Sequence, residues 1–373
     1  MTKRWSGLFV VLLLCLTGCV DRQTAPSELA ETPQKPTAPH QIDGGTKPQT
    51  EEVLQALQAD PATFHFIVGW LDEEHIVYVE KINGSYQVKK FNIATGKQQV
   101  MVEEPSMIID CLIHPSKKYL LLHTGDNPIA ATVKMMTIDG EILDEVSVAS
   151  SELGIQWNDI DPSRILLTAF YEDWTFDVFL YDRHEEFFGL LDIEDPFPKW
   201  FGDEQIIVLQ EKDHSLDGGS LYSYNVTTKE WKSLQQNDII YFDTYEDSLV
   251  TMKVRDESKM IFSVYDPSLK SLSEWTLPAV SNYSEWVIPN VEWLSKTKLV
   301  MTASPAGGQL DELSKPYQLL LIEEGLPKVV SESTVASKIQ CAPSGKKCLT
   351  GYGAEMIVDV ETGKEMNWLL MGE

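Results

Sequence analysis

One phrase recurs along this chain: a short apolar run, a tight polar turn, and then a longer run of large apolar residues. Three copies carry Pro-Ser in the turn, at 113–123 (IHPSKKYLLLH), 160–170 (IDPSRILLTAF) and 341–351 (CAPSGKKCLTG). Related copies with other polar turns lie at 68–79, 198–210, 241–253 and 291–303. A phrase that returns at regular spacing predicts a repeat architecture, in which each copy is one structural unit.

A second phrase follows each copy and reads as a strand, a turn and another strand. Asn or Asp marks five of these turns, where the side chain hydrogen-bonds the local backbone and tolerates left-handed geometry. These residues are Asn92, Asp182, Asn225, Asp266 and Asp359. Each unit then has four strands and about 44 residues, which is typical of a propeller blade. Blades of this kind bury their apolar faces against each other and leave only short edges.

We therefore predict an all-β fold, a β-propeller of four-stranded blades over 64–373. The units count to seven between Phe64 and Met371, and a divergent unit leaves six blades possible. The alternative is a pair of stacked β-sandwiches, which the regular spacing disfavours. The apolar run of each phrase is interpreted as the second strand of a blade, because burial on both faces demands near-continuous hydrophobicity.

The first residues, MTKRWSGLFVVLLLCLTGCV, have the order of a secretion signal. Lys3 and Arg4 precede the apolar stretch 8–16, which is shorter than the roughly 20 residues of a membrane-spanning helix. The ending Leu-Thr-Gly-Cys resembles a bacterial lipobox. This resemblance implies that 1–18 is a lipoprotein signal peptide and that Cys19 carries lipid and anchors the protein. The alternative is an ordinary signal peptide with a cysteine there by chance.

Two further segments precede the propeller. Residues 19–49 combine five prolines with Thr, Gln, Ala and Gly, which predicts a disordered tether. Residues 50–60 are predicted to form a short helix, because Thr50 suits the N-cap and Glu51 and Glu52 suit the first turn.

The net charge of −27 restricts the possible partners. Binding to phosphate backbones needs a basic surface, so we expect no nucleic acid partner and no binding to anionic head groups through bulk charge. The acidity is interpreted as a means of keeping an exposed domain soluble.

The hairpins at 114–118, 161–164 and 342–347 resemble those of TolB-type propellers, although the aspartate of the TolB pattern is missing from all three. The whole layout, from lipobox and Pro-rich tether to acidic propeller, resembles the YqgU-like lipoproteins of Bacillus-type bacteria. That family is described as a six-bladed propeller of unknown function. The resemblance implies a Gram-positive host and the outer, extracytoplasmic face of the cell membrane, and it implies no catalytic residues.

Three cysteines remain after Cys15 leaves with the signal and Cys19 is lipidated. A Ser344-Gly345 turn would place Cys341 opposite Cys348, where non-hydrogen-bonded pairs lie about 4.5 Å apart at Cα, within disulfide reach. We predict this disulfide; the alternative is a pair of small buried residues. Cys111 lies in an apolar strand and is predicted to be inert core.

No pattern in the sequence predicts catalysis, a metal or a cofactor. The stretch 213–218 resembles half of a calcium loop, but its twelfth position is Tyr224 instead of Glu, so a plain turn is the preferred interpretation. His184 has no second histidine at zincin spacing. The G-x-S-x-G, P-loop and G-x-G-x-x-G motifs are absent from the sequence.

Loops between second and third strands emerge on one face of a propeller and are the predicted binding face, since binding residues concentrate on loops held by a rigid scaffold. Their candidate residues are Asp126, Asn127, Tyr171, Glu172, Asp173, Trp174, His214 and Asp217. Exposed loop variation explains the same residues equally well. The sequence thus predicts a membrane-anchored, non-catalytic binding or scaffold module of the cell envelope, with an envelope protein as a possible partner and its oligomeric state open. A hydrolase or lyase of envelope polymers and a small-ligand sensor are the alternatives.

Overall fold

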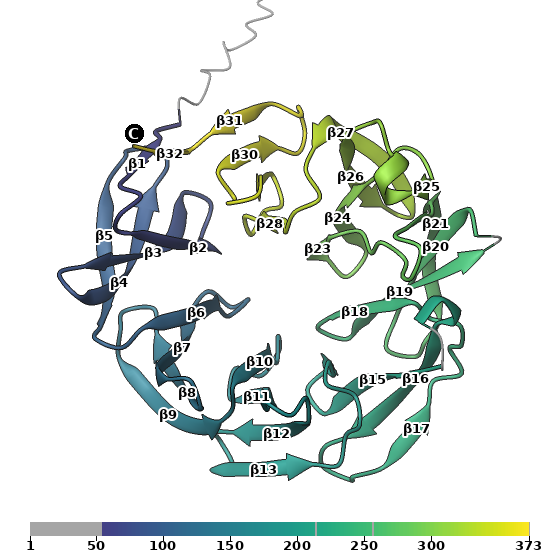
Figure 1. Ribbon diagram of the computed structural model, residues 1–373, viewed down its shortest axis with the longest axis horizontal. Helices are drawn as coiled ribbons and strands as arrows, with labels where there is room; N and C mark the ends of the chain where they lie inside the picture. The colour runs from purple at the N-terminus through teal and green to yellow at the C-terminus, as the bar shows by residue number, and fades with distance from the viewer. Residues whose placement is uncertain (1–53, 213–214, 256, 373) are drawn as a thin grey trace, which may run out of the picture. The chain divides into compact units, whose positions relative to one another are not determined.

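The computed structural model describes residues 54–212, 215–255 and 257–372. Seven antiparallel sheets of four strands each follow one another around a common centre (Figure 1). The predicted all-β propeller is confirmed, and so is the count of seven units. The signal peptide, Cys19 and the tether lie outside the described residues.

The blades follow the chain in order. Blades 1 to 3 consist of β2 Phe64–Trp70, β3 His75–Ile82, β4 Ser85–Asn92, β5 Gln98–Glu104; β6 Ile108–Ile113, β7 Tyr119–Asn127, β8 Ala130–Thr137, β9 Ile142–Ala149; β10 Glu152–Trp157, β11 Arg164–Phe170, β12 Phe176–Asp182, β13 Phe187–Leu191. Blades 4 and 5 consist of β14 Lys199–Phe201, β15 Gln205–Glu211, β16 Gly219–Asn225, β17 Trp231–Ser233; β18 Tyr241–Tyr245, β19 Ser248–Arg255, β20 Lys259–Tyr265, β21 Ser271–Pro278. Blades 6 and 7 consist of β23 Val291–Ser295, β24 Lys298–Ala303, β26 Tyr317–Glu323, β27 Leu326–Thr334; β28 Gln340–Cys341, β29 Lys347–Thr350, β30 Met356–Asp359, β31 Glu365–Asn367.

Smaller elements lie between and beside the blades. A parallel pair joins β22 Val280–Ser281 to β25 Gly308–Gln309, and two 3₁₀ turns span Ser215–Asp217 and Leu310–Glu312. Within the described part of the chain, no helix has the length and apolar character needed to cross a membrane.

The hydrophobic core is divided into seven clusters, and each cluster lies between two neighbouring blades. The apolar runs of the repeated phrase form the second strand of each blade, which is buried on both faces. Leu120, Leu121 and Leu122 on β7 are all fully buried, although successive side chains of a strand point to opposite faces. Leu120 and Leu122 pack toward blade 1 and Leu121 packs toward blade 3. The apolar run is therefore needed to join each blade to both neighbours.

Tryptophans at the ends of inner strands connect blades by hydrogen bonds as well. Trp70, Trp200 and Trp293 each donate their indole N–H to the inner strand of the preceding blade. The acceptors are the Gln340 carbonyl at 3.2 Å, the Gln156 carbonyl at 3.1 Å and the Asp243 carboxylate at 3.0 Å. Trp157 differs, because it donates to the Pro162 carbonyl of its own blade. The recurrent Trp of the phrase is thus an inter-blade contact in three of these four blades.

The ring closes where the two ends of the described chain meet. β1, Leu57–Ala59, pairs in parallel with β32, Leu369–Met371, beside blades 7 and 1. Leu57 and Trp368 are each 1% exposed and belong to the cluster that joins these two blades. The predicted helix over 50–60 is wrong in its described part, because 57–59 is a strand; residues 50–53 lie outside the description. Helix propensity is a weak preference, and here the burial of Leu57 and Ala59 in a tertiary contact overrides it.

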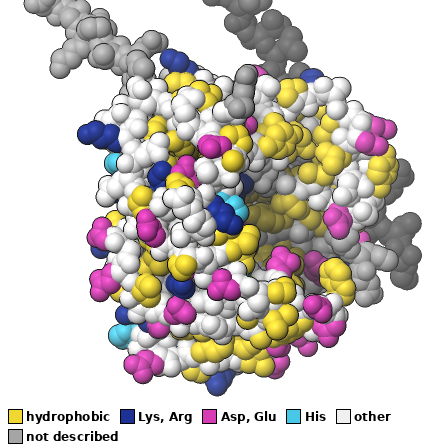
Figure 2. Space-filling model, turned by 60° about the vertical axis from the view of Figure 1, so that its left-hand side comes forward, with side chains coloured by type: hydrophobic (Ala, Val, Ile, Leu, Met, Phe, Trp, Pro, Cys, Tyr) yellow, Lys and Arg dark blue, Asp and Glu magenta, His cyan; other side chains and the backbone are white. Residues whose placement is uncertain are grey.

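Acidic side chains are scattered across the face shown in Figure 2, without a single large patch of one sign. The same view shows a hollow near the middle of this face, lined by hydrophobic side chains. The dispersed charge fits the interpretation that acidity favours solubility.

Leu57→Ala tests the closure of the ring. Because Leu57 is buried between blades 7 and 1, we expect the substitution to lower the free energy of unfolding by about 2–4 kcal/mol in urea denaturation. Gln58→Ala is the matched control, since Gln58 lies on the same strand and is exposed. If Leu57→Ala stays within about 0.5 kcal/mol of wild type, as a surface substitution would, β1 contributes nothing to closure.

Candidate functional site

The inner strand of blade 4 is shorter than the strand it pairs with. β14 has three residues and pairs only with Gln205–Ile207, whereas β15 continues to Glu211. Pro196 and Pro198 directly precede β14. Proline has no N–H to donate to a sheet, so this segment cannot extend the inner strand in the usual way. The second half of β15 is therefore left without an inner neighbouring strand.

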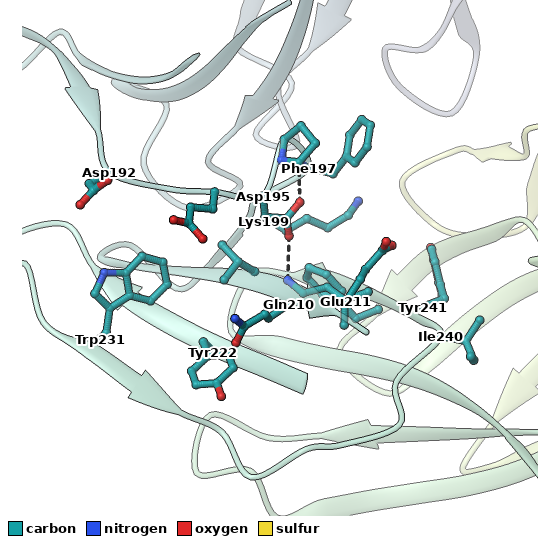
Figure 3. A pocket seen from close by; sticks show the side chains of 15 residues that line it. Asp192, Asp195, Phe197, Lys199, Gln210, Glu211, Tyr222, Trp231, Ile240 and Tyr241 are labelled. Atoms are coloured by element: carbon teal, nitrogen blue, oxygen red, sulfur yellow. Dashed lines mark hydrogen bonds between the residues drawn. The ribbon is translucent and has the colours of Figure 1, made fainter. Parts of the chain in front are cut away.

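The Asp195 side chain occupies part of the missing strand's place (Figure 3). Its carboxylate accepts the Leu209 N–H at 2.7 Å and the Phe197 N–H at 2.8 Å. Burial raises the pKa of Asp195, while the two N–H groups oppose this shift. One carboxylate thus satisfies an edge N–H of β15 and fixes the loop that replaces the strand.

A pocket of about 750 Å³ lies in the resulting gap. Its lining comes from the 192–199 segment, β15, β16, β17 and the start of β18; the residues are Asp192, Glu194, Asp195, Pro196, Phe197, Lys199, Val208, Leu209, Gln210, Glu211, Tyr222, Trp231, Ile240, Tyr241 and Phe242. The pocket thus reaches both faces of blade 4, over the uncovered part of β15.

Strand register divides the lining into two lobes. Tyr222 lies opposite Val208, and Trp231 lies opposite Tyr224, which packs toward blade 3. The lobe on the blade 3 side therefore contains Tyr222, Trp231 and Gln210. The lobe on the blade 5 side contains Glu211 and Phe242, and Figure 3 shows Trp231 and Tyr241 at opposite ends of the pocket.

The charges of the pocket are not balanced. Among the described residues, no lysine, arginine or histidine forms a salt bridge with Asp192, Glu194 or Glu211. The one lysine of the lining, Lys199, is already paired, with its Nζ 2.7 Å from Oδ1 of Asp243. Burial raises the pKa of Tyr241, whose side chain packs against the cluster between blades 5 and 6. The pocket is therefore aromatic and acidic.

The loops predicted from the sequence to form a binding face make mainly local contacts. Asp173 accepts the N–H and the hydroxyl of Thr175 at 3.1 and 2.6 Å, and these bonds lower its pKa. Tyr171 donates its hydroxyl to Asp177 at 2.8 Å, and Trp174 is 95% exposed. Glu172, in the same turn, is exposed. The contacts of this loop explain its turn and do not by themselves indicate a ligand.

The other predicted loop residues are spread over the same face. Asp126 accepts the Ser106 hydroxyl at 3.0 Å, and Asn127 accepts the Ile129 N–H at 3.0 Å. Asp217 lines a second pocket beside Trp286, and His214 lies outside the described residues. None of the described candidates lines the blade 4 pocket. Their role in binding stays a prediction.

The sequence did contain a signal for the pocket. IEDPFPKW, 193–200, places two prolines and two acids directly before an inner-strand Trp. The copy at 198–210 was interpreted as a complete hairpin because its apolar run is intact. Trp231 and Tyr222 belong to strands of ordinary pattern, and only register shows that they face a gap.

The two cysteines of blade 7 lie opposite each other, Cys341 on β28 and Cys348 on β29. The structure joins them as a disulfide with Cα atoms 3.9 Å apart. The Cys341 N–H, which the hairpin does not use, donates to Oε1 of Glu292 at 2.9 Å. Cys111 is buried and free, and burial raises the pKa of its thiol, as inert core requires.

Glu292 of blade 6 accepts a hydrogen bond from the Cys341–Cys348 hairpin of blade 7, and its carboxyl group is poorly solvated. Burial raises its pKa to about 7, against the opposing effects of the Cys341 N–H and then of Lys338 and Lys117. Burial likewise raises the pKa of Asp159 to about 6, and Asp159 of blade 3 accepts the Glu246 N–H of blade 5. These carboxyls are interpreted as structural links between blades, since their contacts are backbone N–H groups.

The Cys341–Cys348 disulfide predicts a specific count of reactive thiols. The mature protein unfolded without reductant should take up alkylating agent at Cys111 and at neither Cys341 nor Cys348, as read by peptide mass spectrometry. After reduction all three should react. Alkylation of Cys341 and Cys348 without reductant would show that the pair is reduced.

Glu292→Gln should change how stability depends on pH. Gln keeps the oxygen that accepts the Cys341 N–H and removes the ionisation. Because the folded-state pKa of Glu292 is raised from its usual 4.5 to about 7, ionisation costs the wild type stability as pH rises through this range. The variant should match wild type near pH 4 and exceed it by about 1–3 kcal/mol at pH 8, in urea unfolding at each pH. A difference that is the same at both pH values, as expected for the exposed control Glu361→Gln, would contradict this account.

Comparison with known proteins agrees with the propeller. The model of the YqgU-like 6-bladed beta propeller domain matches residues 92–353. That stretch includes blades 2 to 6 entirely and parts of blades 1 and 7, so the description counts six blades where this structure has seven four-stranded sheets. The uncharacterized lipoprotein YqgU of Bacillus subtilis (strain 168) is 24% identical over 361 residues, which cover 94% of this chain and 92% of that protein.

A solved structure shows the same fold. The uncharacterized protein lmo1340 from Listeria monocytogenes EGD-e superposes with a TM-score of 0.79 at 19% identity, over 85% of this chain and 98% of that one. TolB from Acinetobacter baumannii matches less well, with a TM-score of 0.42 at 12% identity over 78% of each chain. At 19% identity the lmo1340 structure shows the fold alone. With the family model matching most of its length, this chain belongs to the YqgU-like β-propeller family.

Proposed function

We propose that this protein is a non-catalytic binding module, anchored by lipid on Cys19 at the extracytoplasmic face of the cell membrane, and that its ligand site is the blade 4 pocket. The observation that carries the proposal is the gap beside β15, where a regular inner strand is replaced by an aromatic and acidic pocket. The lipobox and the similarity to a lipoprotein support the anchor. Two acyl chains at the cysteine would give firm attachment.

The pocket has the features of a prebuilt site. Its walls come from strands of blades 4 and 5, and Asp195 holds the connecting segment through two hydrogen bonds. Trp231 is 45% exposed although its ring lies 4.9 Å from that of Tyr224. A large, fixed and partly exposed aromatic side chain offers contact area at little entropic cost, which is typical of ligand sites.

The hydrogen bonds of Asp195 favour binding over hydrolysis as the function of the pocket. A general acid needs a raised pKa and a proton directed at the substrate. Asp195 has the raised pKa, but its carboxylate already accepts two backbone N–H groups. That arrangement supports a structural role for Asp195 and no role as a general acid.

Two exposed tryptophans separate this proposal from the loop prediction. We expect Trp231→Ala to abolish the rise in melting temperature that a fraction of cell-envelope material gives the wild type, because Trp231 supplies the contact area of the pocket. Trp174→Ala is the matched control: it removes an even more exposed Trp from a predicted binding loop and should keep the response. If Trp174→Ala loses the response and Trp231→Ala keeps it, binding occurs at the loops.

The lipid anchor is tested separately, in bacterial cells that express the protein. Cys19→Ala removes the sulfur that would carry lipid, so the protein should lose the detergent-phase partitioning of a lipoprotein. Retention of that partitioning by Cys19→Ala would contradict the anchor.

A further inference from the structure

The blade 4 pocket presents negative charge that the described part of the protein does not neutralise. Asp192 and Glu194 are exposed at the blade 3 side, and Glu211 is exposed at the blade 5 side. Lys199 does not offset them, because its ammonium is paired with Asp243 at 2.7 Å. An anionic ligand would be repelled here, while a cation would gain charge-assisted hydrogen bonds.

The aromatic wall lies beside these acids. Trp231 and Tyr222 come from β17 and β16, on the face of blade 4 that also presents Gln210. Asp192 and Glu194 come from the segment that crosses from blade 3 to blade 4, and Figure 3 shows Asp192 and Trp231 at the same end of the pocket. An indole face is the best aromatic partner of a cation, and flanking carboxylates bind the hydrogens of an ammonium group.

We propose that the pocket selects an organic cation, a ligand that carries a primary ammonium group on an apolar chain or a sugar ring. This inference rests on the proposed binding function and names the class of ligand. The ammonium group binds at Asp192 and Glu194, and the carbon framework packs on Trp231. Glu211 in the second lobe provides a further carboxylate, so ligands with several ammonium groups bind more tightly than those with one.

Three sources share this chemistry: a free polyamine, lysine side chains of a basic peptide, and amino sugars with free amines. Spermidine, tetralysine amide and the chitosan trisaccharide are the probes, each titrated by calorimetry into the lipidated full chain in a neutral detergent. The acetylated form of each probe is its control, because acetylation removes the charge and keeps the framework. The probe that binds most tightly identifies the source.

We expect acetylation to weaken the best probe by about tenfold or more, and added salt to weaken it severalfold. The double variant Asp192→Asn/Glu194→Gln should lose about tenfold in affinity, since the amides keep the shape and lose the charge. The double variant Asp139→Asn/Glu361→Gln is the control. It removes equal charge from exposed turns of blades 2 and 7 and should bind as wild type within about twofold.

Several results would overturn the inference. These are acetylated probes that bind as tightly as the amines, equal losses in the two double variants, or failure of all three amines to bind below about 1 mM. The proposed function fails in a distinguishable way. If neutral chitotriose binds and Trp231→Ala abolishes that binding while no amine binds, the pocket is a ligand site and only the cation inference is wrong. If Trp231→Ala still responds to envelope material, the pocket itself is not the site.

Discussion

Burial of every blade against two neighbours is the constraint on which the rest of this structure depends. A four-stranded sheet with two apolar faces is stable only between two others, so the row of blades has to close on itself. The consecutive leucines of β7 show this at the level of single residues, since alternate side chains serve alternate neighbours. Closure then needs a contact between the chain ends, and β1 paired with β32 supplies it over the cluster of Leu57 and Trp368.

The candidate site lies where this regular pattern is interrupted. Seven inter-blade clusters and the inner-strand tryptophans hold the ring, so the short inner strand of blade 4 does not open it. The interruption leaves β15 with an uncovered edge, and Asp195 satisfies one of its N–H groups with a side chain. Local departures from the rules of a fold that are stabilised elsewhere are expected at functional sites. The ring is therefore stabilised by packing between blades, whereas the pocket results from the short inner strand of blade 4.

The propeller could be predicted from the sequence because its blades have repeated sequence patterns. The blade 4 pocket could not be predicted in this way. The apolar second strands recur seven times, and the turn Asn and Asp residues and the recurrent Trp mark several of the same units, so the count of seven blades follows from them. The strand at 57–59 was missed because Leu-Gln-Ala has no β preference of its own and becomes a strand only against β32. The pocket was missed because the apolar run Ile206–Leu209 looks complete, and the defect lies in its partner strand. Pro196 and Pro198 were visible, but which edge they uncover depends on register.

Amide hydrogen exchange along β15 tests most directly whether this strand loses its inner neighbour after Ile207. N–H groups of alternate residues face the same edge, so those of Ile207, Leu209 and Glu211 all point to the inner side. We expect slow exchange at Ile207, which pairs with β14, and at Leu209, whose N–H Asp195 accepts, but fast exchange at Glu211. Asp195→Ala should then accelerate Leu209 and leave Ile207 slow. Exchange at Glu211 as slow as at Ile207 would show that the inner edge is covered, and the blade 4 pocket would not exist as described.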